Sequence, residues 1–213
     1  KLNNVCWRKL CYNINLLINK SIEFLEKNID KLDNICWQNL CLNKNISVEF
    51  LEKHINKLDV KCWENLCLNT NITIKFIENN IDRLNNICWQ NLCQNEILSI
   101  EFLENYIDKL DIFCWRYLCS NKNISIEFLN NNIDKLDNEY PKYLCLRSDI
   151  SNDFLKNHIN KLDIECWKIL CQNENIPIEF LEKHIDKLDN IICWIYLCRN
   201  KKISIEFLEK NID

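Results

Sequence analysis

The chain has 213 residues, a formal net charge of −4 at pH 7 and a mean hydropathy of −0.27. So mild a charge argues against the strong electrostatic footprint of a protein that binds nucleic acid or an anionic membrane. No apolar run approaches the roughly 18 residues that a membrane-spanning helix needs.

The fifteen cysteines bear on whether the protein works in an oxidising or a reducing compartment. A secreted chain this rich in Cys is usually a small disulfide scaffold. Here their number is odd, and they lie within a regular apolar pattern. Glycosylation sequons at Asn45, Asn71 and Asn123 fall in tight turns of that pattern, where glycans fit poorly. We therefore expect an intracellular, reducing compartment.

Along the chain, the segment ICWQNLCLNKNISVEFLEKHINKLD, residues 35–59, returns in similar form. Tryptophans at 37, 63, 89 and 115 are 26 residues apart, and Pro141 stands one period further, where a Trp is missing. The first Trp spacing is 30, because four residues are added after Tyr12, and the last is 27, because one Ile is added before Cys193.

A fixed period of this size predicts a stacked array. We expect an all-α fold, an α-solenoid of about eight 26-residue two-helix repeats. Two short helices cannot bury their own apolar faces, so each copy has to pack against its neighbours. We expect this array to occupy residues 1–213 as a single domain and to be a fragment of a longer array.

The first helix of a copy is predicted from Ser47–Leu58, SVEFLEKHINKL, by its helical spacing of apolar residues. A Ser or Thr at its start suits the N-cap; these residues are Ser47, Thr73, Ser99, Ser125 and Ser204. Pro177 takes this place once, which suits the start of a helix.

The second helix is predicted from Asn34–Leu42, NICWQNLCL, and ends at Asn43. An Asp at its start suits the N-cap; these residues are Asp33, Asp59, Asp111, Asp137, Asp163 and Asp189. Because the chain contains no Gly, we expect Asn43 to adopt the left-handed conformation that helix C-termini often need.

The block CWQNLC, residues 36–41, raises the question whether its cysteines bind a metal, sense redox state or fill space. At 100° per residue, Cys36, Leu40, Trp37 and Cys41 span one face about 140° wide, with the two Cys at its edges. One helix therefore cannot direct both thiols at one metal. Equivalent Cys of stacked copies should lie ~8–10 Å apart, beyond the ~7 Å limit for a disulfide. We interpret the block as core packing and expect reduced thiols, buried Trp, no metal and no cofactor.

The first helix carries one polar position inside its apolar arc. His54 occupies it, and its equivalents are Asn28, Asn80, Tyr106, Asn132, His158, His184 and Asn211. A buried polar group needs a partner, so we expect a hydrogen bond to a neighbouring turn. Metal binding by the histidines is the alternative.

No arrangement typical of an enzyme stands apart from the repeat, and a phosphate loop needs Gly. The one break in the pattern is NEYPKYLCLRSDISND, residues 138–153, which contains no evident pair of nucleophile and base. We interpret it as a kink in the array and expect no enzymatic activity.

Trp37 to Leu40, WQNL, resembles the W-x-x-L opening of tetratricopeptide repeats. Because that family repeats roughly every 34 residues, the resemblance implies only a helix–turn–helix solenoid. Blocks such as NKNISIEFLNNNIDKLD, residues 121–137, also resemble short-repeat proteins of AT-rich giant viruses that infect amoebae. That resemblance implies an intracellular binding scaffold, in the host cytoplasm or the virion.

We therefore predict a scaffold that binds another macromolecule, above all a protein. The alternatives are a nucleic-acid-binding solenoid, which needs a continuous basic stripe, and a structural protein that associates end to end. The later copies are somewhat basic through Lys142, Arg147, Lys168, Arg199, Lys201 and Lys202. No membrane partner is expected.

The binding residues are predicted on the arc of the second helix opposite Trp, where the copies differ most. Directly after the Trp come Arg8, Gln38, Glu64, Gln90, Arg116, Lys142, Lys168 and Ile195. The next position reads Lys9, Asn39, Asn65, Asn91, Tyr117, Tyr143, Ile169 and Tyr196. Because Tyr and Arg are enriched where interfaces hold their energy, we expect partner contacts in copies five to eight, through Arg116, Tyr117, Lys142, Tyr143, Lys168, Ile169, Ile195 and Tyr196. Plain solvent exposure is the alternative reading of this variety.

Overall fold

The computed structural model describes residues 2–15 and 19–211, so residues 16–18 of the insertion after Tyr12 lie outside it. Over the described residues the chain forms α-helices and short 3₁₀ helices and contains no strand, which confirms the predicted all-α fold. Within the same ranges, no helix is long and apolar enough to cross a membrane.

Two kinds of α-helix alternate along the chain. The helices that carry the CWxxLC block, called Trp helices below, are α1 (Asn4–Asn13), α3 (Asn34–Leu42), α5 (Val60–Leu68), α7 (Asn86–Gln94), α9 (Ile112–Ser120), α11 (Tyr140–Cys145), α13 (Ile164–Gln172) and α15 (Ile191–Leu197). The helices that carry the repeated Phe, called Phe helices, are α2 (Asn19–Lys27), α4 (Val48–Lys53), α6 (Ile74–Glu78), α8 (Ile100–Asn105), α10 (Ile126–Asn131), α12 (Asn152–Asn157), α14 (Ile178–Lys183) and α16 (Ile205–Glu209).

Each predicted first helix is shorter than expected, because the backbone leaves the α conformation at the polar position, as at His54 (φ −116°, ψ 25°). A short 3₁₀ helix follows. These are η1 (Ile29–Lys31), η2 (Ile55–Lys57), η3 (Ile81–Arg83), η4 (Ile107–Lys109), η5 (Ile133–Lys135), η6 (Ile159–Lys161) and η7 (Ile185–Lys187).

The polar position itself is used differently from the prediction. The amides of Asn28 and Asn80 donate to the carbonyls of Phe24 and Phe76, four residues earlier in the same helix, at 2.8 and 2.9 Å. They satisfy carbonyls that the ending helix leaves without a partner, so the expected bond to a neighbouring turn is wrong here. His54 instead reaches Glu26 of the preceding Phe helix, at 3.2 Å.

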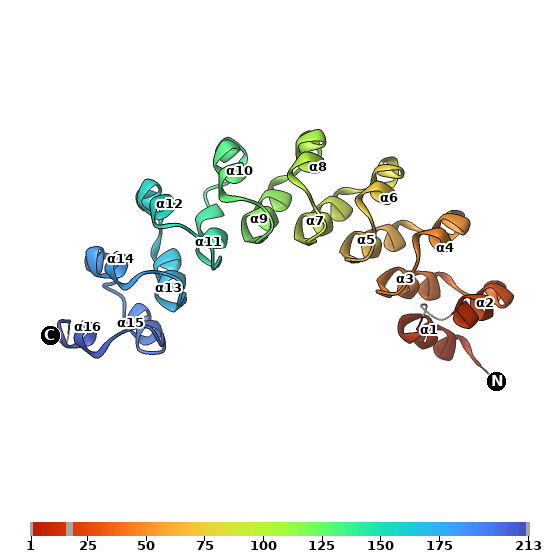
Figure 1. Ribbon diagram of the computed structural model, residues 1–213, viewed down its shortest axis with the longest axis horizontal. Coiled ribbons are helices and arrows are strands. Elements are labelled where there is room, and N and C mark those ends of the chain that lie inside the picture. The colour runs from red at the N-terminus through yellow and green to blue at the C-terminus, as the bar shows by residue number, and fades with distance from the viewer. Residues whose placement is uncertain (1, 16–18, 212–213) are drawn as a thin grey trace. The chain divides into compact units, whose positions relative to one another are not determined.

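The chain divides into two compact units, Lys1–Cys114 and Trp115–Asp213, and the boundary falls within α9. In the first unit α1, α3, α5 and α7 pack one against the next, and the Phe helices form a second row (Figure 1). In the second unit α11 packs against α13, and α13 against α15. Within each unit, this packing of one Trp helix against the next agrees with the expected solenoid.

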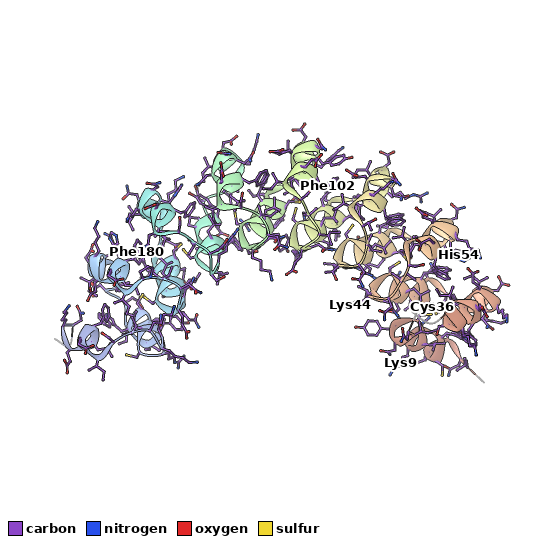
Figure 2. The ribbon with its side chains drawn as sticks, viewed as in Figure 1. Lys9, Cys36, Lys44, His54, Phe102 and Phe180 are labelled. Carbon is purple, nitrogen blue, oxygen red and sulfur yellow. The ribbon has the colours of Figure 1, made fainter. Side chains whose placement is uncertain are left out.

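The core lies between the two kinds of helix. Cys36, Trp37, Leu40 and Cys41 are all buried, as the helical angles predicted. The repeated Phe stacks on the Trp of the preceding helix, and Phe102 on α8 faces Trp89 on α7 with 5.9 Å between ring centroids (Figure 2). The predicted Trp core is confirmed.

The predicted caps of the Phe helices form. The Ser or Thr side chain accepts a hydrogen bond from the backbone N–H of the repeated Phe, at 3.1–3.2 Å for Ser47, Thr73, Ser99, Ser125 and Ser204. Ser151 does the same for Phe154 at 3.1 Å, although the sequence had not singled it out. Pro177 holds the N-cap position without a side-chain bond.

The predicted caps of the Trp helices form in four of six places: Asp33, Asp59, Asp111 and Asp163 accept from the N–H of the first Cys at 2.8–2.9 Å. Two predicted caps are wrong. Asp137 precedes the shortened α11, whose N-cap is Glu139. Asp189 is displaced by the added Ile, and Asn190 caps α15 instead.

The expected left-handed Asn is also wrong. Asn43 has φ −71°, and no described residue has a positive φ. The residue is instead buried, and its amide donates to backbone carbonyls of the preceding copy, among them Ile14 at 2.9 Å. Its Oδ1 accepts from the N–H of Asn45 at 2.9 Å. Asn is required here as a donor to one copy and an acceptor within its own turn, not for its backbone freedom.

Candidate functional site

The position directly after Trp, called the linker position below, in most copies bonds to a residue at or just before the start of the next Trp helix, which is usually its N-cap. Gln38 donates to Asp59 at 2.9 Å, and Gln90 donates to Asp111 at 2.8 Å. The further pairs are Arg8–Asp33, Glu64–Asn85, Arg116–Asp137 and Lys142–Asp163. The variety at this position is therefore tied to contacts between neighbouring copies.

The chemistry of the two partners matches within each pair. Arg, Gln and Lys are donors and face an Asp, whereas Glu64 is an acceptor and faces Asn85, whose amide donates to it at 3.0 Å. Glu64 is nearly buried and also accepts from Lys61 at 2.9 Å. The guanidinium of Arg8, bonded to Asp33, lowers the pKa of that carboxyl to about 2.

The next position, called the amide position, serves the preceding copy in the first unit. Asn39, Asn65 and Asn91 donate to the carbonyls of the preceding linker residues at 2.9–3.0 Å. From copy five onwards Tyr117, Tyr143, Ile169 and Tyr196 replace these amides and are half-buried. Their apolar or phenolic surface lies where the earlier copies carry an internal hydrogen bond.

Of the eight predicted binding residues, two share one ion-pair network. Arg116 binds Asp137 at 2.7 Å and Glu139 at 3.3 Å, and Lys142 reaches Glu139 at 3.9 Å and Asp163 at 3.3 Å. The hydrogen bonds that Arg116 donates to Asp137 and Lys142 donates to Asp163 raise the pKa of both cations above their ordinary values. Both cations thus have carboxylates as partners within the chain.

The other predicted residues lie further along the second unit. Lys168 binds Glu165 at 2.7 Å, and that bond raises the pKa of the lysine. Ile169 and the exposed Leu146 line a shallow hollow of about 270 Å³ between α11 and α13. Ile195 is 44% exposed, and Tyr196 beside it is half-buried. The structure thus spaces the predicted residues along one side of successive Trp helices instead of gathering them at one point.

Two rows of exposed apolar residues on the Trp helices were not selected from the sequence. The residue before the first Cys forms one row, with Val5 57%, Ile35 41%, Ile87 48% and Phe113 49% exposed. The residue after the second Cys forms the other, with Tyr12, Leu42 and Leu68 in the first unit. In the second unit the equivalent residue Leu146 is exposed as well. Seven residues separate the rows on each helix, about 10.5 Å.

In each unit, the exposed apolar residues, the linker position and the amide position are together called the outer face, which is the side of the Trp helices opposite the buried Trp. Its middle consists of the linker and amide residues, most of which are half-buried, and apolar side chains flank it on both sides. Lys9 and Lys44 are exposed near this face in the first unit (Figure 2). Such a surface can bind a partner through apolar contacts with a few charges at the rim.

In the described part of the chain, no three His, Cys, Asp or Glu residues lie close enough together to hold a metal ion. Burial raises the pKa of the Cys119 thiol to about 12 and that of the Tyr140 phenol to about 12. A thiol is nucleophilic as its thiolate, so burial keeps Cys119 unreactive at neutral pH.

Comparison with family models, with curated proteins and with solved structures found no match.

Proposed function

We propose that the chain is a non-enzymatic repeat scaffold that binds another protein through the outer face of its Trp helices, in a reducing compartment. The observation that carries this proposal is the exposed apolar residue before the first Cys, which four of the five copies in the first unit share; Lys61 takes its place in the third. Isolated exposed apolar side chains need no explanation, but contiguous ones mark interaction surfaces.

The corresponding positions of the second unit carry different residues. Tyr117, Tyr143 and Tyr196 offer aromatic area, which interfaces use more than other surfaces do. This arrangement supports a protein partner that contacts several copies at once.

The nucleic-acid alternative receives less support. Counterion release needs basic side chains that are free to meet phosphates. Lys142 and Lys168 are paired with carboxylates, and Arg147 is buried and bonded to Asp149 at 2.6 Å. Three of the six basic residues that the sequence singled out in the later copies are therefore already engaged within the chain.

Site-specific photo-crosslinking tests the proposal. A benzoylphenylalanine replaces Ile35 in one variant and Tyr143 in a second, both on the outer face. It replaces Glu52, an exposed residue on the Phe helix α4, in the control. Irradiation in cells should yield protein adducts from the first two sites and not from the third.

Disruption of the face should then remove the adducts. In the Ile35 crosslinking variant, Leu42→Asp with Leu68→Asp should reduce the yield roughly tenfold, as expected for a loss of about 1.4 kcal/mol, while circular dichroism stays helical. Equal adducts from all three sites would exclude the outer face. Adducts sensitive to nuclease would favour the nucleic-acid alternative, and adducts with a second copy of the chain would favour self-association.

A further inference from the structure

A hollow of about 410 Å³, called the Tyr106 hollow below, lies between the 3₁₀ helices η3 and η4 at the start of α7, within the first unit. Its lining includes Leu84, Trp89, Tyr106 and the carboxylates of Asp82 and Asp108. Trp89 is only 4% exposed and closes the bottom of the hollow. Because the buried Trp lies on the side of α7 opposite the outer face, this hollow is separate from the protein-binding surface proposed above.

Tyr106 brings a third aromatic ring to the Trp and Phe pair of copy four. Trp89 stacks on Phe102 with 5.9 Å between ring centroids. The ring of Tyr106 is tilted against both, at 5.6 Å from Trp89 and 4.9 Å from Phe102. Tyr106 is half-buried, and the other copies carry Asn or His at its position. Copy four therefore presents a tyrosine ring where the other copies have an amide or an imidazole.

Two other copies already hold a cation over an aromatic ring in the corresponding region. In copy three the guanidinium carbon of Arg83 lies 5.6 Å from the ring centroid of Trp63. In copy six Nζ of Lys161 lies 5.4 Å from that of Tyr140. Both distances are within the roughly 6 Å at which a cation and an aromatic ring attract each other. Lys109, the counterpart of Arg83 in copy four, lines the hollow but makes no such ring contact within the described residues.

The charges of the Tyr106 hollow favour a cation as its ligand. Asp82 and Asp108 are exposed, and within the described part of the chain neither makes an ion pair. The equivalent Asp134 and Asp186, by contrast, lie 3.6 and 3.1 Å from the lysine that follows each of them. Of the residues that line the hollow, two are acidic and Lys109 alone is basic, so its net charge is negative.

We propose that the Tyr106 hollow binds a guanidinium group, as the arginine side chain of a partner would supply it. The plane of the guanidinium stacks on the ring of Tyr106, in the way that Arg83 lies over Trp63. Its N–H groups donate to the carboxylates of Asp82 and Asp108. A guanidinium suits this site because it is planar, stacks on aromatic rings and carries several donors in a fixed fork. The start of α7 has a partial positive charge that opposes any cation, so we expect weak binding that salt reduces.

The test titrates the folded full chain, isotopically labelled on its tyrosine rings, with N-acetyl-arginine amide at constant ionic strength and follows the ring resonances by NMR. The Tyr106 resonance, identified by its loss in Tyr106→Asn, should shift in a saturable manner. N-acetyl-citrulline amide has nearly the same shape without the charge and should bind at least about tenfold more weakly. A Tyr106 resonance that arginine leaves in place, or that citrulline shifts equally, would overturn the proposal.

Charge variants separate the hollow from the general field of the chain. Asp82→Asn with Asp108→Asn should weaken arginine binding roughly tenfold or more. Lys109→Gln should strengthen it, because the substitution removes the cation that lines the hollow. Asp134→Asn with Asp186→Asn removes the same charge from equivalent exposed positions of the second unit and should leave binding unchanged. Equal weakening by the two double variants would overturn the proposal, because arginine would then respond only to net charge.

Discussion

At the scale of single residues, the buried Asn two places after the second Cys connects one copy to the next. Asn69 is 4% exposed and donates to the carbonyls of Cys41 and Asn43 at 2.9 and 3.1 Å. Its Oδ1 accepts from the N–H of Asn71 at 3.0 Å. One side chain thus satisfies backbone groups of two copies that would otherwise be buried without partners.

We predict that Asn69→Ala costs about 2–4 kcal/mol of unfolding free energy, because it leaves more than one buried carbonyl or N–H without a partner. Asn13 is the matched control, since it occupies the same position in copy one but is exposed and bonds only to Lys9 of its own helix, at 3.1 Å. Asn13→Ala should change stability by no more than about 0.5 kcal/mol. Urea unfolding measures both; equal losses would show that the Asn acts only within its own turn.

The sequence located this Asn but did not reveal its role. Its carbonyl partners lie 26–32 residues away, so no local pattern identifies them. Arg147 shows the same requirement met by a different side chain, because its guanidinium donates to the carbonyl of Asn121 at 3.1 Å from an equally buried position. From the sequence alone, an Asn that donates hydrogen bonds to the preceding copy cannot be told from an Asn that only forms a turn.

At the scale of helices, the linker position makes each Trp helix specific for the cap of its neighbour. Helical angles correctly predicted the buried face of Cys, Trp and Leu, because burial on one helix depends only on spacing along it. They could not predict the linker pairs, which depend on how far one helix is displaced along the next. The variable positions that suggested partner binding are thus partly occupied by bonds between copies.

A double-mutant cycle tests this specificity. Asn85→Asp should keep the cap but place a second carboxylate against the nearly buried Glu64, at a cost of about 1–3 kcal/mol. Adding Glu64→Gln should recover most of that loss, because the new pair repeats the donor and acceptor of Gln38 and Asp59. A coupling energy of at least ~1 kcal/mol is expected from urea unfolding of the four proteins; strictly additive effects would contradict the pairing.

At the scale of the whole molecule, stability is the sum of copies and of the interfaces between them. The 26-residue period predicted this architecture, and the contacts between successive helices agree with it. The division between Cys114 and Trp115 falls within a regular copy, so nothing in the repeat pattern indicated it. The partner stays a prediction, since surface exposure alone does not name what covers it.

The sixth copy should be the least stable part of the second unit. Its Trp helix α11 has six residues, lacks a side-chain cap bond and carries Pro141 in place of Trp. A missing cap alone is worth about 1 kcal/mol, so amides of α11 should exchange with deuterium roughly fivefold or more faster than those of α13. Hydrogen exchange with mass spectrometry measures both helices in one sample; equal protection would show that the break in the sequence has no energetic effect.

The linker pairs also determine which copies of the repeat can be duplicated. A duplicate of copy two, with Asp33 as cap and Gln38 as linker, would pack beside the original with the Gln38 donor facing the Asp33 acceptor. A duplicate of copy three would instead bring a buried Glu64 against an Asp cap such as Asp59. The order of the copies therefore determines whether each linker faces a complementary cap, and Glu64 and Asn85 have to be inherited together. An array that grows by tandem duplication can insert some of its copies singly and others only in pairs.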